Sequence, residues 1–215
     1  MTPHRRSAAA LLLAGPAVFL LAEFVAAAAW SDPPYSYTHH FISNLGVRGP
    51  AEAFGQAIDS PLAWVMNTGF FLFGLTILAG VATLGLRGRR RWTLTATAAL
   101  VAAGGVLLAL FPGTGADDTA GDLHGLGAFA AIVGGNVLVI LLGRAHRSLG
   151  VSARTGKALV ALGVAGLASL AAFMAVVMSE AGILVGLVER AAVYPYLAGL
   201  IGAGVAMRNR RASLR

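Results

Sequence analysis

Polar residues whose types could perform chemistry gather in two short stretches of an otherwise apolar chain. In the first stretch, Ser43 and Asn44 follow the pair His39 and His40. If this stretch is helical, His39 shares a face with Ser43, and His40 shares one with Asn44. A serine beside a histidine could act as nucleophile and base, and two histidines could bind a metal. The alternative is an interfacial aromatic segment in which Ser43 or Asn44 caps a helix or turn. The sequence leaves both interpretations open.

The second stretch, residues 111–125, is rich in glycine and aspartate. We expect a helix to end at Pro112 and a new one to begin with Asp122 as its N-cap, which places His124 in the first turn. Asp122 and His124 are two residues apart, so they point in different directions on a regular helix. Asp118 or a residue from another segment is therefore a better partner for His124 in a possible divalent-metal site. The spacing of the aspartates is not that of an EF-hand loop.

Three further ionisable residues lie inside or at the start of long apolar segments, where a charge is costly unless it is paired. Glu23 lies about 10 Å below the end of the first segment at helical rise. Arg190 is a candidate partner for Glu23, in a structural ion pair that locks the helices, or alternatively for an anionic head group. Glu189 precedes Arg190 and points in a different direction, so we expect each of the two to contact other helices.

Uncharged residues in the apolar segments indicate how these segments pack. Asn67 and Asn136 are expected to form hydrogen bonds between helices. Glycine pairs with a spacing of four, such as Gly121 and Gly125, predict a close approach of neighbouring helices.

The elements that must position these residues follow from composition. Hydrophobic residues make up 57% of the 215 residues and charged residues 12%, with a mean hydropathy of +0.76. A soluble domain has roughly 25% charged residues. Six apolar segments are each long enough to cross a bilayer as a helix: 7–30, 61–86, 92–111, 123–143, 156–179 and 183–207. The sequence predicts an all-α polytopic membrane bundle of six transmembrane helices in a single domain, 1–215.

Two features of the connections refine this prediction. The connection 31–60 mixes aromatic and polar residues, which predicts a loop and a short helix on the surface or folded over the bundle. The first segment could alternatively be a signal peptide, although Glu23 and its length favour a retained helix.

Charge is divided between the two sides of the predicted membrane. Of the 16 Lys and Arg residues, all but Arg48 and Arg190 lie at the ends of the chain or on alternate connections, and all 9 acidic residues lie on the opposite side. The positive-inside rule then places both termini in the cytoplasm, which predicts a multi-pass protein of the cell membrane. The rule does not explain the acidic residues, so the acidic side is where we expect a functional site.

Composition also excludes several classes of function. The net charge of +7 and the pI near 11.0 follow from membrane topology, so we expect no nucleic-acid partner. Because the chain has no cysteine, thiolate metal sites, cysteine nucleophiles and disulfides are excluded. No two histidines face each other at matched depth, so we expect no haem.

Several short motifs together resemble a prokaryotic membrane-protein family known as domain of unknown function 998. The motifs that carry the resemblance are Ser43-x-Leu45-Gly46, Asn67, Gly74, Phe111-Pro112, His124, and Glu189-Arg190 with a nearby Tyr-Pro. The resemblance covers nearly the whole chain. It implies a six-helix bundle and supplies no established reaction.

Three functions remain open from the sequence. The first is a polar site at the outer ends of the helices, catalytic or only binding, that takes a lipid or a lipid-linked small molecule. The alternatives are an accessory or scaffold protein without catalysis and a small-solute transporter. The candidate catalytic residues are Glu23, Ser43, Asp122 and His124, the candidate binding residues are Asn44, Asn67, Glu189 and Arg190, and the candidate metal ligands are Asp118 and His124. Membrane lipids are the expected partners, and the sequence does not predict the oligomeric state.

Overall fold

Long helices account for most of the protein. The computed structural model describes residues 3–53, 55–113, 119–179 and 184–209. Its long helices are α1 (Pro3–Ala29), α2 (Ala63–Ala82), α3 (Gly88–Leu110), α4 (Thr119–Arg144), α6 (Ala153–Met178) and α7 (Val185–Asn209), and α5 (His146–Leu149) is a single short turn. These long helices correspond to the six apolar segments, which confirms the all-α prediction.

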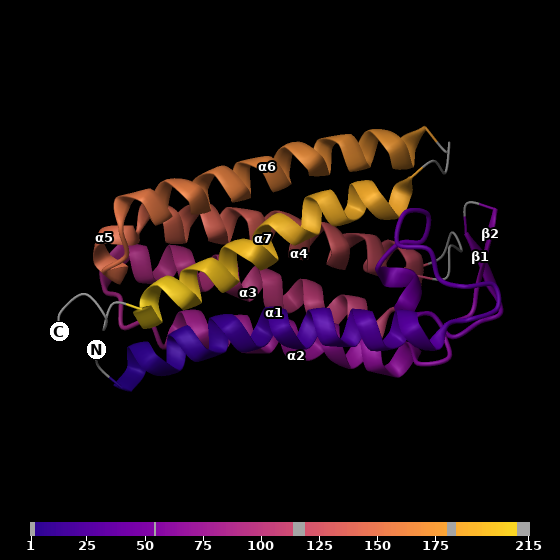
Figure 1. Ribbon diagram of the computed structural model, residues 1–215, viewed down its shortest axis with the longest axis horizontal. Helices are drawn as coiled ribbons and strands as arrows, with labels where there is room; N and C mark the ends of the chain where they lie inside the picture. The colour runs from indigo at the N-terminus through magenta and orange to yellow at the C-terminus, as the bar shows by residue number, and fades with distance from the viewer. Residues whose placement is uncertain (1–2, 54, 114–118, 180–183, 210–215) are drawn as a thin grey trace.

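The long helices form a closed ring in chain order. Each packs against the next, α7 returns to pack against α1, and α4 also contacts α7 across the ring. The start of α1 and the end of α7 lie at the same end of the bundle as α5 (Figure 1). We call this the α5 end, and we call the opposite end, which carries a β-hairpin, the hairpin end.

Hydropathy identifies the molecule as a multi-helix membrane protein. Among the described residues, five helices are long and apolar enough to cross a membrane: α1, α2, α3, α4 and α6. The last long helix, α7, is outside this set. Glu189, Arg190, Tyr194 and Tyr196 lie along its first half, and their polar groups lower its hydropathy. Glu189, Arg190 and Tyr196 are buried within the bundle, and Tyr194 is 37% exposed.

Small residues bring neighbouring helices into close contact. A Cβ added to Gly104 on α3 would lie 2.6 Å from the backbone nitrogen of Ala131 on α4. Gly143 on α4 and Gly156 on α6 meet in the same way near the α5 end, where a Cβ on either residue would lie within 2.8 Å of the carbonyl oxygen of the other. These contacts fix α6 against α4 at that end. From there α6 diverges from α4 towards the hairpin end (Figure 1).

Residues 31–60, which we call the cap, fold over the hairpin end of the bundle (Figure 1). They contain a 3₁₀ helix, Ser43–Gly46, and an antiparallel hairpin of β1 (Ala51–Ala53) and β2 (Gln56–Ile58), in which Glu52 pairs with Ala57. The short helix over the bundle was predicted, and the hairpin was not.

Some local predictions were wrong. Turns and a bend precede the 3₁₀ helix, so His39 and Ser43 do not share a helical face. Helix α4 begins at Thr119, so Asp122 lies in its first turn and is not its N-cap. Gly125 has no neighbour within 4 Å of an added Cβ and mediates no helix contact. Asp118 lies outside the described residues.

The two asparagines differ in what they contact. Asn136 Nδ2 donates a hydrogen bond of 2.9 Å to the carbonyl oxygen of Ala192, so its predicted role between helices is confirmed. Asn67 Nδ2 instead donates to the carbonyl oxygen of Gly46, at 2.9 Å. It therefore holds the 3₁₀ helix of the cap to α2 and does not join two of the long helices.

Candidate functional site

A buried ion pair joins the first and last helices below the cap. Arg190 Nη2 lies 2.9 Å from Glu23 Oε1, and Arg190 Nε donates to the same oxygen at 3.0 Å. Tyr194 also donates its hydroxyl hydrogen to Glu23 Oε1, at 3.0 Å. Glu23 is 2% exposed and Arg190 5%. The predicted pairing of these two residues is confirmed, and it links α1 to α7.

The remaining donors of Arg190 hold the cap. Its Nη1 donates to the carbonyl oxygens of Tyr37, at 2.7 Å, and His40, at 3.1 Å, and also to that of Gly186 on its own helix. Its Nη2 donates to the hydroxyl of Tyr35. The guanidinium carbon lies 4.8 Å from the centroid of the Tyr37 ring, within the range of a cation–π contact. All three nitrogens of Arg190 are thus engaged inside the protein.

His40 is part of this structural cluster. Its ring stacks on those of Trp30 and Tyr35, with centroid distances of 5.0 and 5.3 Å. Its Nδ1 accepts a hydrogen bond from the backbone N–H of Ser36 at 2.9 Å. Burial lowers the pKa of His40, and the nearby His39 and Arg190 lower it further. The ring is therefore neutral and holds the cap in shape.

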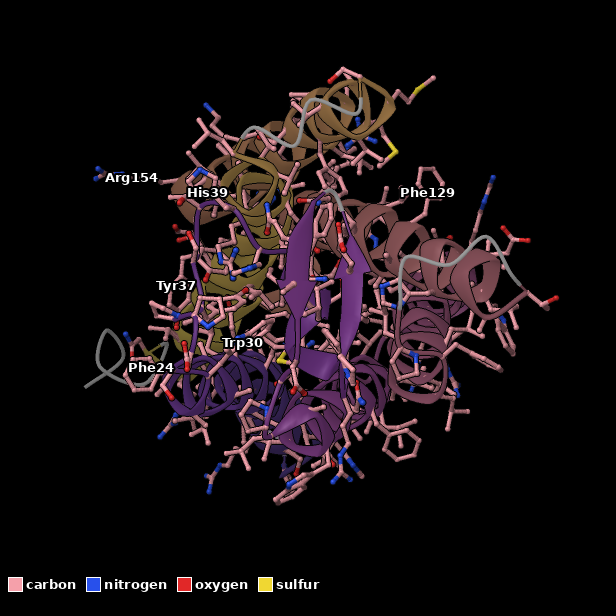
Figure 2. The ribbon with its side chains drawn as sticks, turned by 90° about the vertical axis from the view of Figure 1, so that its right-hand side faces the viewer. Phe24, Trp30, Tyr37, His39, Phe129 and Arg154 are labelled. Atoms are coloured by element: carbon pink, nitrogen blue, oxygen red, sulfur yellow. The ribbon has the colours of Figure 1, made fainter. Side chains whose placement is uncertain are left out.

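Seen from the hairpin end, the cap segment runs outward across the bundle. Figure 2 shows Trp30 near the middle of the molecule, Tyr37 farther out and His39 at the margin. His39 is exposed, and its Nδ1 contacts the hydroxyls of Ser36 and Thr38. The two histidines therefore have separate surroundings and do not face a common site.

A cavity of about 710 Å³ lies between α4 and α6 beside the cap, and we call it the lateral cavity. Five of the candidate residues line it: Ser43, Asn44, Asp122, His124 and Glu189. They come from the cap, from α4 and from α7, so separate parts of the chain supply its polar wall. Three other candidates, Glu23, Asn67 and Arg190, do not line it.

Glu189 is the most deeply buried acid of the lateral cavity. It is 6% exposed, and its Oε2 accepts the backbone N–H of Ile42 at 2.5 Å. Among the described residues, Oε2 is the carboxylate oxygen that accepts a hydrogen bond, and none is recorded to Oε1. Glu189 also lines a smaller cavity of about 30 Å³ that lies deeper in the ring against Phe19 and Tyr196. One carboxylate oxygen thus holds the cap while the other is left without a protein partner beside open space.

His124 presents an acceptor to the same cavity. Its Nδ1 lies 2.8 Å from the carbonyl oxygen of Phe111, which can only accept, so Nδ1 carries the hydrogen. In the neutral ring Nε2 is then an acceptor. The bond ties the end of α3 to the first turns of α4. Asn44 has a local role as well, because its Oδ1 accepts the backbone N–H of Phe41 at 2.7 Å.

The other wall of the lateral cavity is apolar. Its apolar side chains come from the cap, α4 and α6: Phe41, Leu126, Ala128, Phe129, Ile132, Leu170, Phe173, Met174 and Val177. Leu126 is 56% exposed and Phe129 51%, so this wall reaches the outer surface of the bundle. Figure 2 shows Phe129 at the margin of the molecule. The cavity is therefore polar towards the cap and apolar towards the flank of the bundle.

The predicted metal site and the predicted nucleophile stay predictions. No group of three or more His, Asp or Glu residues with a geometry for metal binding occurs within the described part of the chain. The metal proposal also required Asp118, which is outside that part. Ser43 lines the cavity with His124, but no hydrogen bond joins the two side chains. These residues share a cavity without forming a nucleophile–base pair.

Sequence reasoning missed the apolar wall. Its α6 residues, such as Phe173 and Met174, resemble other apolar residues of a membrane helix, and no spacing marks them. Tyr35 was also missed as a partner of Arg190, although the aromatic content of the cap was a signal that could have drawn attention to it.

Comparison with known proteins completes the description of the site. Neither a search of curated proteins nor a search of solved structures found a match. A family model described as "Protein of unknown function (DUF998)" matches residues 13–206, which include α2, α3, α4 and α6 in full, most of α1 and α7, and every residue of the lateral cavity. The chain therefore belongs to the DUF998 family of proteins of unknown function.

Proposed function

We propose that this protein is a cell-membrane protein with six membrane-spanning helices, both termini in the cytoplasm, and an amphiphile-binding site in the lateral cavity. The hydrocarbon tail of the amphiphile lies along the apolar wall formed by α4 and α6. Its polar head reaches Ser43, His124 and Glu189 beside the cap.

The observation that carries this proposal is the two-sided lining of one cavity. Polar groups from the cap, α4 and α7 line one side, and the other side continues to exposed apolar residues such as Leu126 and Phe129. The volume of about 710 Å³ is within the usual range for small-molecule sites, roughly 300–1,000 Å³. A ligand entering from the bilayer would keep its tail in an apolar medium while its head gains polar partners.

The six-helix topology is supported by the burial of the charged residues of α7. Its polar residues Glu189 and Arg190 are 6% and 5% exposed, so the surface that α7 would present to lipid lacks these charges. Arginines and the single lysine cluster at the α5 end, as the positive-inside rule expects for a cytoplasmic side.

A photo-crosslinking experiment tests the binding site. The probe is a monoacylglycerol analogue that carries a photoactivatable diazirine and an alkyne in its acyl chain, added to the purified protein in detergent. We expect crosslinked peptides from α4 near Phe129 and from α6 near Met174, because both line the apolar wall.

A cavity-filling variant provides the comparison. Ala128 lines the lateral cavity and is partly buried, so Ala128→Phe should fill the space and reduce crosslinking several-fold. Ala99→Phe is the matched control, because Ala99 is exposed on α3 away from the cavity. Equal labelling of both variants and the unaltered protein, or labelling spread over all helices, would rule out the proposed site.

A further inference from the structure

We infer that the lateral cavity selects amphiphiles whose head group donates hydrogen bonds and carries no phosphate, such as a hydroxyl or amine head group. This inference rests on the proposed function, because it specifies the ligand class of the same cavity. It follows from the polar groups that line the cavity and from the engagement of the only buried guanidinium in the described residues near it.

The polar wall offers acceptors where the head group would lie. Glu189 is more than nine-tenths buried, lines the cavity and has one oxygen without a donor among the described residues. The neutral ring of His124 contributes the acceptor Nε2, because its Nδ1 hydrogen is bound by the carbonyl oxygen of Phe111. Asp122, which is exposed, adds a second carboxylate to the same lining. A head group that donates hydrogen bonds satisfies these atoms.

Among the described residues, no lysine or arginine lines the cavity to balance a phosphate. On this side of the chain the sequence has two arginines, Arg48 and Arg190. Arg48 is exposed on the cap and outside the lining. Arg190 uses all three nitrogens on Glu23, on Tyr35 and on backbone carbonyl oxygens, and it does not line the cavity.

Electrostatic interactions then determine which head groups bind favourably in the cavity. A phosphate would lie beside the Asp122 carboxylate and the buried carboxyl group of Glu189 in a partly dehydrated cavity. Like charges repel there, and each lost hydration contact is costly. An ammonium group gains an attraction of opposite sign from the same carboxylates, and a neutral hydroxyl gains hydrogen bonds without repulsion. The arrangement favours these two classes and disfavours the phosphate.

Competition against the photo-crosslinking probe tests this selectivity. The unlabelled competitors are a monoacylglycerol, a long-chain primary amine and phosphatidic acid, with matched acyl chains and at equal mole fraction in the micelle. We expect the first two to suppress labelling. Phosphatidic acid should need a concentration roughly tenfold higher or more to give the same suppression. Equal suppression by phosphatidic acid would overturn the inference and leave the proposed function intact. Absence of specific labelling by the probe would instead refute the proposed function.

Variants assign the selectivity to the carboxylate. Glu189→Gln keeps an amide oxygen that can accept the Ile42 N–H and removes the negative charge. This variant should weaken competition by the amine several-fold, and it should reduce the difference in potency between the amine and phosphatidic acid. Glu52→Gln makes the same change at an exposed residue of the hairpin outside the cavity and should leave the ranking unchanged.

Should Glu189→Gln fail to fold, Asp122→Asn tests the same charge effect at an exposed position in α4. The charge explanation is wrong if neither variant of the lining shifts the ranking of the competitors.

Discussion

At the scale of single residues, Arg190 illustrates how a charge inside a membrane protein acquires a structural role. It cannot lose its proton in a protein, so its burial requires acceptors on every nitrogen. The structure supplies these from Glu23, from Tyr35 and from the carbonyl oxygens of Tyr37 and His40. The result is a connection between α1, the cap and α7 through one side chain.

Replacing Arg190 and replacing Glu23 should lower the free energy of unfolding by different amounts. Arg190→Gln leaves Glu23 and the cap carbonyls without their donors, so we expect a loss of roughly 3–5 kcal/mol in the free energy of unfolding. Glu23→Gln removes the counter-charge of Arg190, but it keeps an oxygen that can accept from Arg190 and Tyr194 and leaves the cap contacts in place. A smaller loss of about 1–3 kcal/mol is therefore expected. Unfolding by SDS titration in mixed micelles measures both values. Equal losses would contradict the view that Arg190 also holds the cap.

The sequence predicted part of this residue-level detail. The pairing of Glu23 with Arg190 could be predicted because charges at membrane depth need partners and few were available. The cap partners could not, because backbone carbonyls carry no sequence signal. The same limit applies to Asn67, whose partner is the Gly46 carbonyl. The sequence also did not predict that Ser43 and His124 line one cavity, because this depends on the three-dimensional path of the cap.

At the scale of elements, the docking of the cap on α7 depends on a residue without a side chain. A Cβ added to Gly186 would lie 2.2 Å from the carbonyl oxygen of His40 and 2.8 Å from that of Tyr37. The backbone of the cap also accepts the Leu187 N–H at the carbonyl oxygen of Thr38, at 3.2 Å. The first turn of α7 therefore needs glycine at this position to meet the cap backbone.

We expect Gly186→Ala to displace the cap and to lower the free energy of unfolding by about 1–3 kcal/mol, since neither backbone oxygen can rotate away. The matched control is Gly125→Ala in α4, where an added Cβ meets nothing within 4 Å. That change should be neutral or stabilise by up to about 1 kcal/mol through helix propensity. Limited proteolysis of the cap provides a second readout, and unchanged protection in Gly186→Ala would be evidence against the close docking.

Element boundaries show where sequence reasoning works and where it stops. The apolar segments matched the long helices because a run of apolar residues long enough to span a membrane has few other stable structures. The prediction for Asp122 was wrong because the helix begins at Thr119, and the small residues of that region permit either start. The hairpin was missed because β1 and β2 are three residues each, which is too short for an alternating pattern to be distinguished from a loop.

At the scale of the whole molecule, charge and architecture agree. The alternate connections that carry the basic residues, such as the α2–α3 connection and α5, lie at the end of the bundle where α1 begins and α7 ends (Figure 1). The cap, the ion pair and the lateral cavity lie towards the opposite end. The proposed cytoplasmic side and the candidate site therefore occupy different ends of the ring.

Cysteine labelling in intact cells tests the proposed orientation, and the natural chain has no cysteine to interfere. We expect Glu52→Cys, on the exposed hairpin, to react with a membrane-impermeant maleimide added outside the cell. Ala153→Cys, exposed at the start of α6 near the α5 end, should react only after the membrane is permeabilised. The reverse pattern would place the lateral cavity on the cytoplasmic side and overturn the proposed topology.

The closure of the ring by α7 bears on how the protein is made. Because synthesis proceeds from the N-terminus, Glu23 and the cap are present in the membrane before Arg190 and Glu189 have been translated. Until then Glu23 lacks the guanidinium, and the cap lacks the backbone and side-chain contacts that α7 provides. The candidate site is thus completed by the last helix to emerge. A nascent chain cut short before α7 would expose an uncompensated acid, a feature by which membrane quality control could distinguish it from the finished protein.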